Sequence, residues 1–369
     1  MFIYIFTIFI FFIFSYLEIR TTITEKEKSL LYSALFIALV VQVGLRWETG
    51  TDWNYYIENF SNTTSIENIL INILIGFEIG YGFTVYFVRL FTDNYVYFLL
   101  FHAIVYYYLI FRASKRLSPF PILSLLLFYA LTMGYLGSNR QLIALAICLY
   151  ALRFVVERKP IIFFSLVFFA FLFHTSALLF AVYYFLNKDF QKKYVLGALF
   201  LAIAIGQTQI PNLLFSGIGN LLPGASAGKT DFYSNKDNFQ DLSLTISGLI
   251  RRLLYFFLFF INYDTLSKKF EHYKLIFNGF LFGLIFYFLF SNSILIVVNR
   301  ASLYFNVMEC FLLASQLLLF NFARDRSYIL FIIVLYAFFL FFQSIGSYPD
   351  LFLPYKGIFI NSDFNRNLY

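Results

Sequence analysis

Long stretches of apolar residues with almost no charge recur along this chain, and they limit its fold more than any other feature. Hydrophobic residues make up 61% of the 369-residue sequence, whereas charged residues make up only 13%. A soluble protein does not need so much apolar surface, and runs of about 20 apolar residues are typical of helices that cross a bilayer. The sequence therefore predicts an all-α, polytopic integral membrane protein.

We expect one transmembrane domain with about 12 crossing helices and one further helix that is partial or re-entrant. The partial helix is 81–91, because a full crossing there would put the next basic loop on the wrong side of the membrane. The stretch 160–187 is long for one crossing, and His174 in its middle favours two short helices that meet there. The predicted crossings lie near residues 2–17, 28–45, 94–111, 119–136, 140–156, 160–187, 193–206, 243–262, 274–296, 301–322 and 327–345.

Lysines and arginines cluster in alternate loops, and this alternation sets the expected orientation because cytoplasmic loops carry an excess of both residues. The external side then carries the loops 46–78 and 207–242 and the C-terminal tail 346–369. Since the basic residues orient helices, the net charge of +7 does not indicate a nucleic-acid partner. The cytoplasmic clusters are Arg112/Lys115/Arg116, Arg153/Arg158/Lys159, Lys188/Lys192/Lys193, Lys268/Lys269/Lys274 and Arg324/Arg326.

The first external loop combines an arginine, two carboxylates and both tryptophans of the chain within a few residues. Aromatic faces stack on sugar rings and carboxylates bind hydroxyl groups, so this mixture suits a site for a sugar phosphate. An interfacial aromatic belt with solvated charges explains the loop equally well. The candidate residues are Arg46, Trp47, Glu48, Asp52, Trp53, Tyr55 and Tyr56.

Two arginines stand where a helix is expected to begin on the external side, Arg140 after Asn139 and Arg300 after Asn299. Free backbone N–H groups and the helix dipole favour anions at such a terminus. A lipid diphosphate at that depth would need such groups. The alternative for each arginine is a boundary anchor that snorkels to the interface.

Arg251 and Arg252 lie several residues inside the apolar run 243–262. A charge at the centre of a membrane helix costs about 2.5–3.5 kcal/mol on insertion scales. Neighbouring helical residues point about 100° apart, so at most one of the pair can snorkel comfortably. We expect the other arginine to face an internal cavity.

His174 is the histidine expected nearest to the external face, where it could act as a general base or orient a hydroxyl group. A structural hydrogen-bonding role is an equally good interpretation. His102 and His272 lie on other elements, and Cys148 and Cys310 lie in separate apolar runs. The sequence therefore gives no support for a metal site, a cofactor or a disulfide framework.

Several short motifs then occur in the order found in one known family, over nearly the whole chain. They are Arg46-x-x-x-Gly50-x-Asp52-x-x-Tyr55-Tyr56, Glu78-x-Gly80-Tyr81, Arg140-Gln141, Phe173-His174-x-Ser176-Ala177, Arg300-x-x-x-Tyr304-Phe305 and Tyr348-Pro349…Pro354-Tyr355. In these motifs the chain resembles the EpsG family of Wzy-like exopolysaccharide and O-antigen polymerases.

The resemblance implies a multi-pass protein of the bacterial cytoplasmic (inner) membrane with a GT-C-like arrangement of helices. Its activity would be glycosyl transfer between two undecaprenyl-diphosphate-linked oligosaccharides on the periplasmic or exterior face, without a nucleotide sugar or a metal ion. Donor, acceptor and membrane lipid are then the expected partners, and a chain-length regulator protein is a further option.

Such a transfer needs stabilisation of the leaving diphosphate as the anomeric bond breaks, for which preorganised arginines and helix N-termini are suited. We assign Arg140, which is also expected to act in catalysis, and Arg300 to the diphosphate. Further candidates for that role are Arg46, Arg251 and Arg252. His174 is the first candidate for the base and Asp52 the second. The expected sugar-binding residues are Trp47, Glu48, Trp53, Tyr55, Tyr56, Gln141 and Tyr304.

Other activities also fit a membrane cavity lined with cations. A flippase or transporter of lipid-linked oligosaccharides would place its charges near the midplane, open to both sides, whereas here most crowd towards one face. An O-antigen ligase differs from a polymerase only in its acceptor, and the sequence does not discriminate the two. An acyltransferase would need a donor from the inside, where the loops are short and basic.

Overall fold

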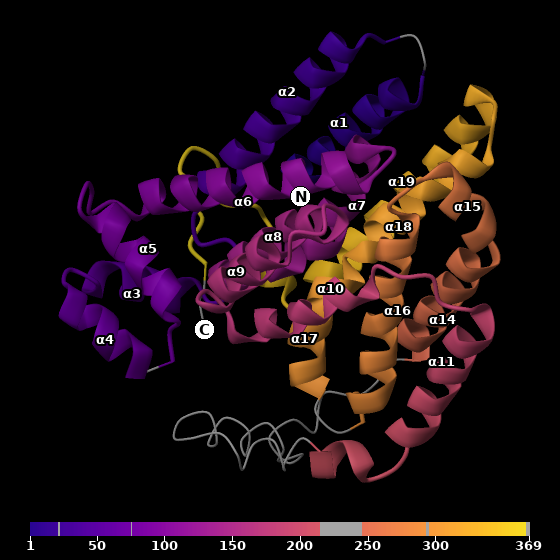
Figure 1. Ribbon diagram of the computed structural model, residues 1–369. Helices are drawn as coiled ribbons and strands as arrows, with labels where there is room; N and C mark the ends of the chain where they lie inside the picture. Colours follow the sequence, from indigo (N-terminus) through magenta and orange to yellow (C-terminus); the bar gives the residue numbers. More distant parts are fainter. Residues whose placement is uncertain (21–22, 75, 215–245, 293–294, 367–369) are drawn as a thin grey trace. The chain divides into compact units, whose positions relative to one another are not determined.

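The computed structural model describes residues 1–369 except 21–22, 75, 215–245, 293–294 and 367–369 (Figure 1). The described part is built of helices and turns. It contains two isolated β-bridges but no β-strand. Seven of its helical segments are long and apolar enough to cross a bilayer, which confirms an all-α polytopic membrane protein. They are α1 (Phe2–Ile19), α2 (Glu25–Gly44), α6 (Tyr95–Leu117), α8 (Asn139–Val156), α16 (Tyr273–Phe290), Arg300–Leu319 and α19 (Ala323–Ile345).

The other predicted crossings are also helical, but their helices are shorter. The break predicted within 160–187 is confirmed, because α9 ends at Phe171 and the next helical segment starts at Thr175, so that His174 lies between them. The shorter helices are α7 (Pro121–Thr132) with η1 (Met133–Tyr135), α9 (Pro160–Phe171), η2 (Thr175–Val182) with α10 (Tyr183–Leu186), α11 (Lys192–Gly206), α14 (Ile246–Ile261) and α15 (Tyr263–Lys269).

The predicted partial helix is confirmed as α5 (Ile79–Arg89), whose 11 residues are too few to cross a bilayer. The loop 46–78 differs from the expectation, since it contains α3 (Trp53–Asn62) and α4 (Ile66–Leu74). Trp53, Tyr56 and Phe60 are buried on one face of α3, so packing of that face stabilises a helix too short to persist alone. Most of the predicted loop 207–242 lies outside the described residues.

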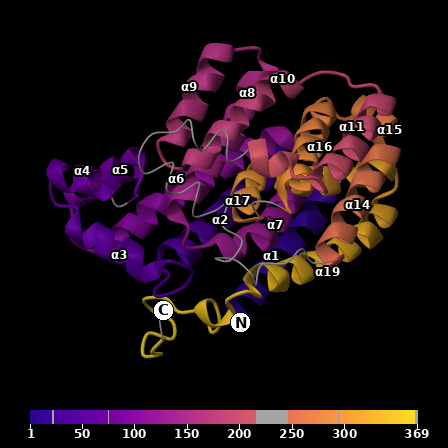
Figure 2. The same ribbon diagram turned by 90° about the horizontal axis from the view of Figure 1, so that it is seen from below.

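The described chain divides into two compact units, residues 1–181 with 313–369 and residues 182–312. In the first unit α8 packs between α6 and α9, and α2 packs on α6. α8 is 78% buried whereas α1 is only 33% buried, and nearly all residues of α7 are buried, so α7 and α8 are inner helices of this unit. Figure 2 shows the start of α1 beside the end of α19, in agreement with their contacts.

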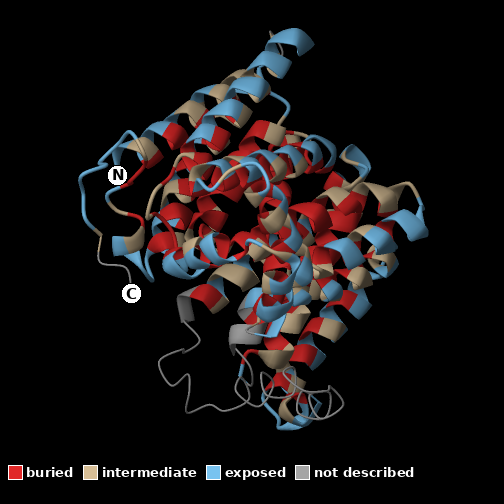
Figure 3. Ribbon diagram, turned by 90° about the vertical axis from the view of Figure 1, so that its left-hand side faces the viewer, coloured by how far each residue is buried: buried red, intermediate tan, exposed pale blue. Residues whose placement is uncertain are grey.

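α6 and α8 run in the same direction, because His102 early in α6 contacts Asn139 at the start of α8, and Arg116 near the end of α6 lies beside Glu157 at the end of α8. In the second unit α16 packs against α11 and against α17 (Leu295–Asn306), which is followed by α18 (Met308–Ser315). Large apolar side chains remain exposed on the outer faces of both units, where Figure 3 colours residues pale blue. Such surfaces suit contact with lipid.

Candidate functional site

The first loop packs directly on the stretch that precedes α8. The Thr51 N–H donates to the Leu136 carbonyl over 2.9 Å. Gly137 has a φ of +110°, and a Cβ at this position would overlap the Thr51 carbonyl oxygen. Only glycine fits there, so Gly137 allows the two segments to approach closely. The structure thus brings together two of the sequence motifs that were predicted to share one side of the membrane.

Arg140 lies in the first turn of α8, as the sequence predicts, and its guanidinium is held on three sides. Nη1 donates to Glu78 Oε2 over 2.6 Å and to the Gly76 carbonyl over 2.8 Å, while Nε donates to the Tyr56 hydroxyl over 3.0 Å. The ring of Phe77 lies 4.8 Å below the guanidinium carbon. The short segment before α5 therefore fixes the arginine with a charge, a carbonyl and a ring.

One nitrogen of this guanidinium has no such contact. No described residue accepts a hydrogen bond from Arg140 Nη2, and the side chain is 18% exposed. Tyr56 is buried, and burial raises the pKa of its phenol, so the hydroxyl keeps its proton at neutral pH. Arg140 Nη2 and the Tyr56 hydroxyl proton are thus donors for an anionic or polar ligand.

Arg46 is placed differently from Arg140, since only 1% of the residue is exposed. Its Nη1 donates to the Val43 carbonyl over 2.8 Å and its Nη2 to Asn139 Oδ1 over 3.0 Å. The Asn139 carbonyl in turn accepts a hydrogen bond from His102 Nε2 over 2.9 Å. These bonds tie α2, α6 and the first residue of α8 together around a buried charge.

Replacing Asn139 by leucine should lower the stability of the protein. The change removes the acceptor of a buried guanidinium, and a hydrogen bond to a charged group contributes about 1.5–3 kcal/mol. Thermal unfolding in detergent would measure the loss as a lower Tm. Asn62→Leu, at an exposed position on α3, is the control and should leave Tm nearly unchanged. Equal Tm values for the Asn139→Leu and Asn62→Leu variants would contradict the structural role of Asn139.

The aromatic residues of the first loop form two groups. Trp47 and Trp53 pack edge to face at 5.3 Å, and Trp53 is buried against Tyr95. Tyr55 stacks on Phe77 at 4.4 Å and remains 40% exposed. Of the predicted sugar-binding aromatic residues, Tyr55 therefore presents the most accessible ring, whereas Trp53 is part of the core.

The C-terminal tail packs on the first loop and forms hydrogen bonds and an ion pair with it. Lys356 Nζ forms an ion pair with Glu48 at 2.5 Å, and the Lys356 carbonyl accepts hydrogen bonds from the Trp47 N–H and the Thr49 hydroxyl. The Gly50 N–H donates to the Leu351 carbonyl over 3.0 Å. Glu48 was predicted to bind sugar, and in this structure its carboxylate is paired with the tail.

The two candidate bases lie on different segments of the first unit. Asp52 has a φ of +54° and precedes α3 without capping it through its side chain. His174 is half-buried, and its Nδ1 lies 2.6 Å from Ser176 Oγ. The Gly80 N–H donates to the Leu172 carbonyl over 2.8 Å. This bond brings the turn with His174 next to the segment that carries Glu78, the partner of Arg140.

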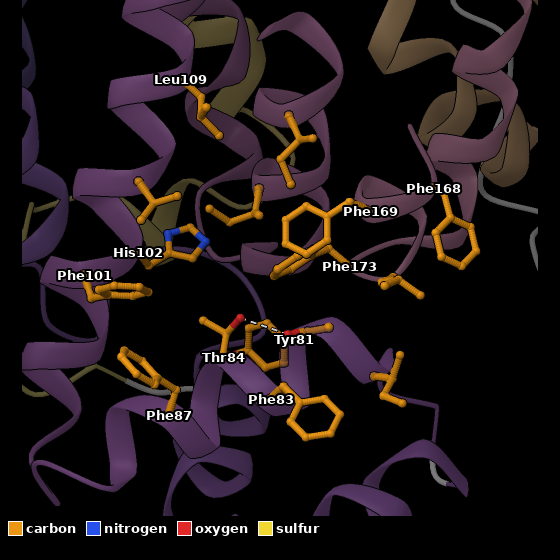
Figure 4. A pocket seen from close by; sticks show the side chains of 16 residues that line it. Tyr81, Phe83, Thr84, Phe87, Phe101, His102, Leu109, Phe168, Phe169 and Phe173 are labelled. Atoms are coloured by element: carbon orange, nitrogen blue, oxygen red, sulfur yellow. Dashed lines mark hydrogen bonds between the residues drawn. The ribbon is translucent and has the colours of Figure 1, made fainter. Parts of the chain in front are cut away.

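An apolar cavity of about 560 Å³ adjoins the Arg140 cluster. Residues from α5, α6, α8, α9 and the turn after α9 line it, and Figure 4 shows the ring of His102 among phenylalanine rings. Tyr81 belongs to both features, because it lines the cavity and packs edge to face on Tyr56 at 5.4 Å. The phenylalanines of the lining are Phe83, Phe87, Phe101, Phe168, Phe169 and Phe173.

The second unit contains the remaining candidates. The expectation that a helix begins at Arg300 is wrong, because α17 already begins at Leu295. The apolar residues before Asn299 continue the helix towards its start, so Arg300 lies exposed in its second turn and not at a free N-terminus. Tyr304 is fully buried on the same helix, while Gln141 is buried in the first unit.

Arg251 and Arg252 contact different partners, as the angle between neighbouring helical residues requires. Arg251 Nη1 lies 4.0 Å from Glu309 Oε1, and Glu309 is buried on α18. Arg252 donates to the Gly248 carbonyl over 3.1 Å, and its guanidinium lies 3.9 Å from the Tyr287 ring centre. Arg251 thus faces a buried carboxylate, and the internal cavity expected beside one of the two arginines stays a prediction.

Comparison with known proteins adds one finding to this geometry. The sequence model of the EpsG family matches residues 29–357, which is most of the chain. The chain belongs to the EpsG family. No curated protein and no solved structure matches it. All candidate site residues of this EpsG-family protein lie within the matched range, and membership is consistent with a membrane protein of polysaccharide biosynthesis.

Three charged residues of the EpsG-family chain were not assigned a role from the sequence, namely Glu78, Lys356 and Glu309. Each one pairs with an arginine or a carboxylate that was singled out. Glu309 could have been found, because a carboxylate within an apolar run is a functional signal in itself. Glu78 and Lys356 lie in loops, where no periodicity indicates their partners.

Proposed function

We propose that this EpsG-family protein polymerises polyprenyl-diphosphate-linked oligosaccharide repeat units by glycosyl transfer on the exterior face of the bacterial cytoplasmic membrane. Family membership supports polysaccharide biosynthesis, and the arrangement around Arg140 supports this particular reaction. The proposal includes a donor and an acceptor that both carry a lipid diphosphate.

The observation that carries the proposal is a charged donor group beside an apolar cavity. Arg140 is fixed by Glu78, Gly76 and Tyr56 and still has Nη2 without a described partner. The cavity of about 560 Å³ is lined in part by Ile79, the residue directly after Glu78. A substrate with a diphosphate and a hydrocarbon chain combines the two kinds of group that such a site binds.

In the proposed reaction the anomeric C–O bond of the donor breaks and the lipid diphosphate leaves with the electron pair. A hydroxyl group of the acceptor forms the new glycosidic bond and gives its proton to a base. Arg140 Nη2 and the Tyr56 hydroxyl would stabilise the charge that grows on the diphosphate. His174 and Asp52 remain the candidates for the base.

The proposal also assigns a role to each of the other arginines and to Tyr55. Arg46 would hold the start of α8 and not contact the diphosphate, because its guanidinium is buried and bonded within the protein. Tyr55 would stack on a sugar ring. Arg300, Arg251 and Arg252 remain proposed phosphate ligands in the second unit.

A purified preparation in proteoliposomes with lipid-linked repeat units tests the proposal. We expect glycans longer than one repeat unit, seen as a ladder by gel electrophoresis or mass spectrometry. Movement of the lipid across the bilayer without elongation would indicate a transporter. Transfer to a lipid A core acceptor without a ladder would indicate a ligase. Either of these results would overturn the polymerase assignment.

A further inference from the structure

A second cavity, which is polar, lies between the far ends of α6 and α8, away from the end at which His102 meets Asn139. Its volume is about 360 Å³. Half of the residues that line it are cations, and none is a carboxylate. The lining consists of Arg112, Ala113, Lys115, Arg116, Leu117, Leu149, Tyr150 and Arg153.

The positive charge around this cavity exceeds the negative charge of the described residues beside it. Arg116 and Arg153 both lie near Glu157, at 3.6 and 3.5 Å, and Lys159 lies 3.0 Å from the same carboxylate. One carboxylate is thus shared by three cations. The remaining charge calls for an anion from outside the chain.

Arg112 and Lys115 have no carboxylate within ion-pair distance in the part of the chain that the structure describes. Each is exposed and lies over an aromatic ring, Arg112 at 5.6 Å from the Tyr108 centre and Lys115 at 5.1 Å from the Tyr32 centre. Both residues line the cavity and are accessible to a ligand, and Lys115 also lines a neighbouring cavity that contains Glu18 and Glu25.

An exposed apolar stripe runs along α6 and ends at these cations. Tyr97, Ile104 and Tyr108 are each exposed by about half, and Arg112 follows Tyr108 after one helical turn. Residues at such spacings lie on one face of a helix. A ligand with phosphate at the cavity and hydrocarbon chains along this stripe fits the arrangement, whereas free phosphate would not use the stripe.

We propose that the cavity between the ends of α6 and α8 binds the phosphate of an anionic phospholipid headgroup. Basic pockets between membrane helices on the cytoplasmic side bind such headgroups in other proteins. α6 and α8 are long enough to span the bilayer, so their last turns lie at its boundary. This site is separate from the proposed polymerase site and does not depend on it.

The double variant Arg112→Gln/Lys115→Gln tests the proposal, with Lys268→Gln/Lys269→Gln as a control of equal charge change. The control residues are exposed in the last turn of α15. Native mass spectrometry of the full-length protein, titrated with phosphatidylglycerol or phosphatidylcholine, measures lipid affinity. We expect wild type to prefer phosphatidylglycerol, and the Arg112/Lys115 variant to bind it about 30-fold more weakly, whereas the control keeps the preference.

Several outcomes would overturn the proposal. One is equal affinity of the wild-type protein for the two lipids, a result that requires no variant. Another is an equal loss of affinity for phosphatidylglycerol in both double variants, which would mean that diffuse surface charge, and not this cavity, attracts the lipid. Displacement of phosphatidylglycerol by millimolar inorganic phosphate would indicate a site for the free ion. The charge-conserving variant Arg112→Lys/Lys115→Arg should retain the lipid, which separates loss of charge from loss of folding.

Discussion

Replacing Arg140 by glutamine should abolish polymer formation while the protein remains in the membrane. In the proposed reaction the guanidinium stabilises the leaving diphosphate, and removal of one such donor typically lowers kcat by about 10²–10³-fold. Glutamine cannot restore the positive charge. The measurement is the length and amount of glycan made in proteoliposomes, together with the amount of protein recovered in the membrane fraction.

The partner of Arg140 provides the control that separates catalysis from folding. The Arg140–Glu78 pair is largely buried, with 18% and 14% of the two side chains exposed, so loss of one member should destabilise the protein by less than the ~3–5 kcal/mol of a fully buried pair. In Arg140→Gln/Glu78→Gln both charges are gone, so this double variant should melt higher than Arg140→Gln. We expect the double variant to be folded and inactive. Recovery of long glycans in it would show that Arg140 serves only the ion pair with Glu78.

Replacing Gly137 by alanine should produce the second large effect, a loss of both stability and activity. The residue has a φ of +110°, and a Cβ would overlap the Thr51 carbonyl oxygen. Backbone strain of this kind costs about 1–3 kcal/mol, and the overlap adds to it. The first loop and the start of α8 must then separate, which displaces Arg140 from Tyr56. Thermal unfolding and the polymerisation assay would both report the change.

Gly197 offers a matched control for the same substitution. It lies in α11, and among the described residues no atom of another part of the chain lies within 4 Å of a Cβ built there. Alanine in the middle of a helix is more stable than glycine by about 0.5–1 kcal/mol. Gly197→Ala should therefore keep activity and melt at or slightly above the wild-type temperature. Similar behaviour of Gly137→Ala and Gly197→Ala would contradict the close approach at Gly137.

The helices could be predicted from the sequence because their signal is local. A run of apolar residues specifies a membrane helix without knowledge of its neighbours. The break near His174 and the position of Arg140 in the first turn of α8 followed in the same way. The start of α17 was misjudged, because Asn299 suggests a cap for a helix that begins at Arg300, whereas the apolar residues Leu295–Val298 already belong to the helix.

The pairs within the candidate site could not be predicted, because they join residues far apart in the chain. Glu78 and Arg140 are 62 positions apart, and Glu48 and Lys356 are 308 positions apart. No periodicity links such positions, and only the packing of the helices brings them together. For the same reason the sequence placed Arg46 and Arg140 in one class, although the structure buries the first and exposes part of the second.

The contact between the C-terminal tail and the first loop has a consequence for biosynthesis. The loop emerges early from the ribosome, but Lys356 and Leu351, which hold Glu48 and Gly50, are made only after α19. A partly synthesised chain would therefore hold an unfinished first loop until α19 and residues 351–356 have been made. In the proposed reaction, the substrate would therefore meet an ordered first loop only after Lys356 has been synthesised.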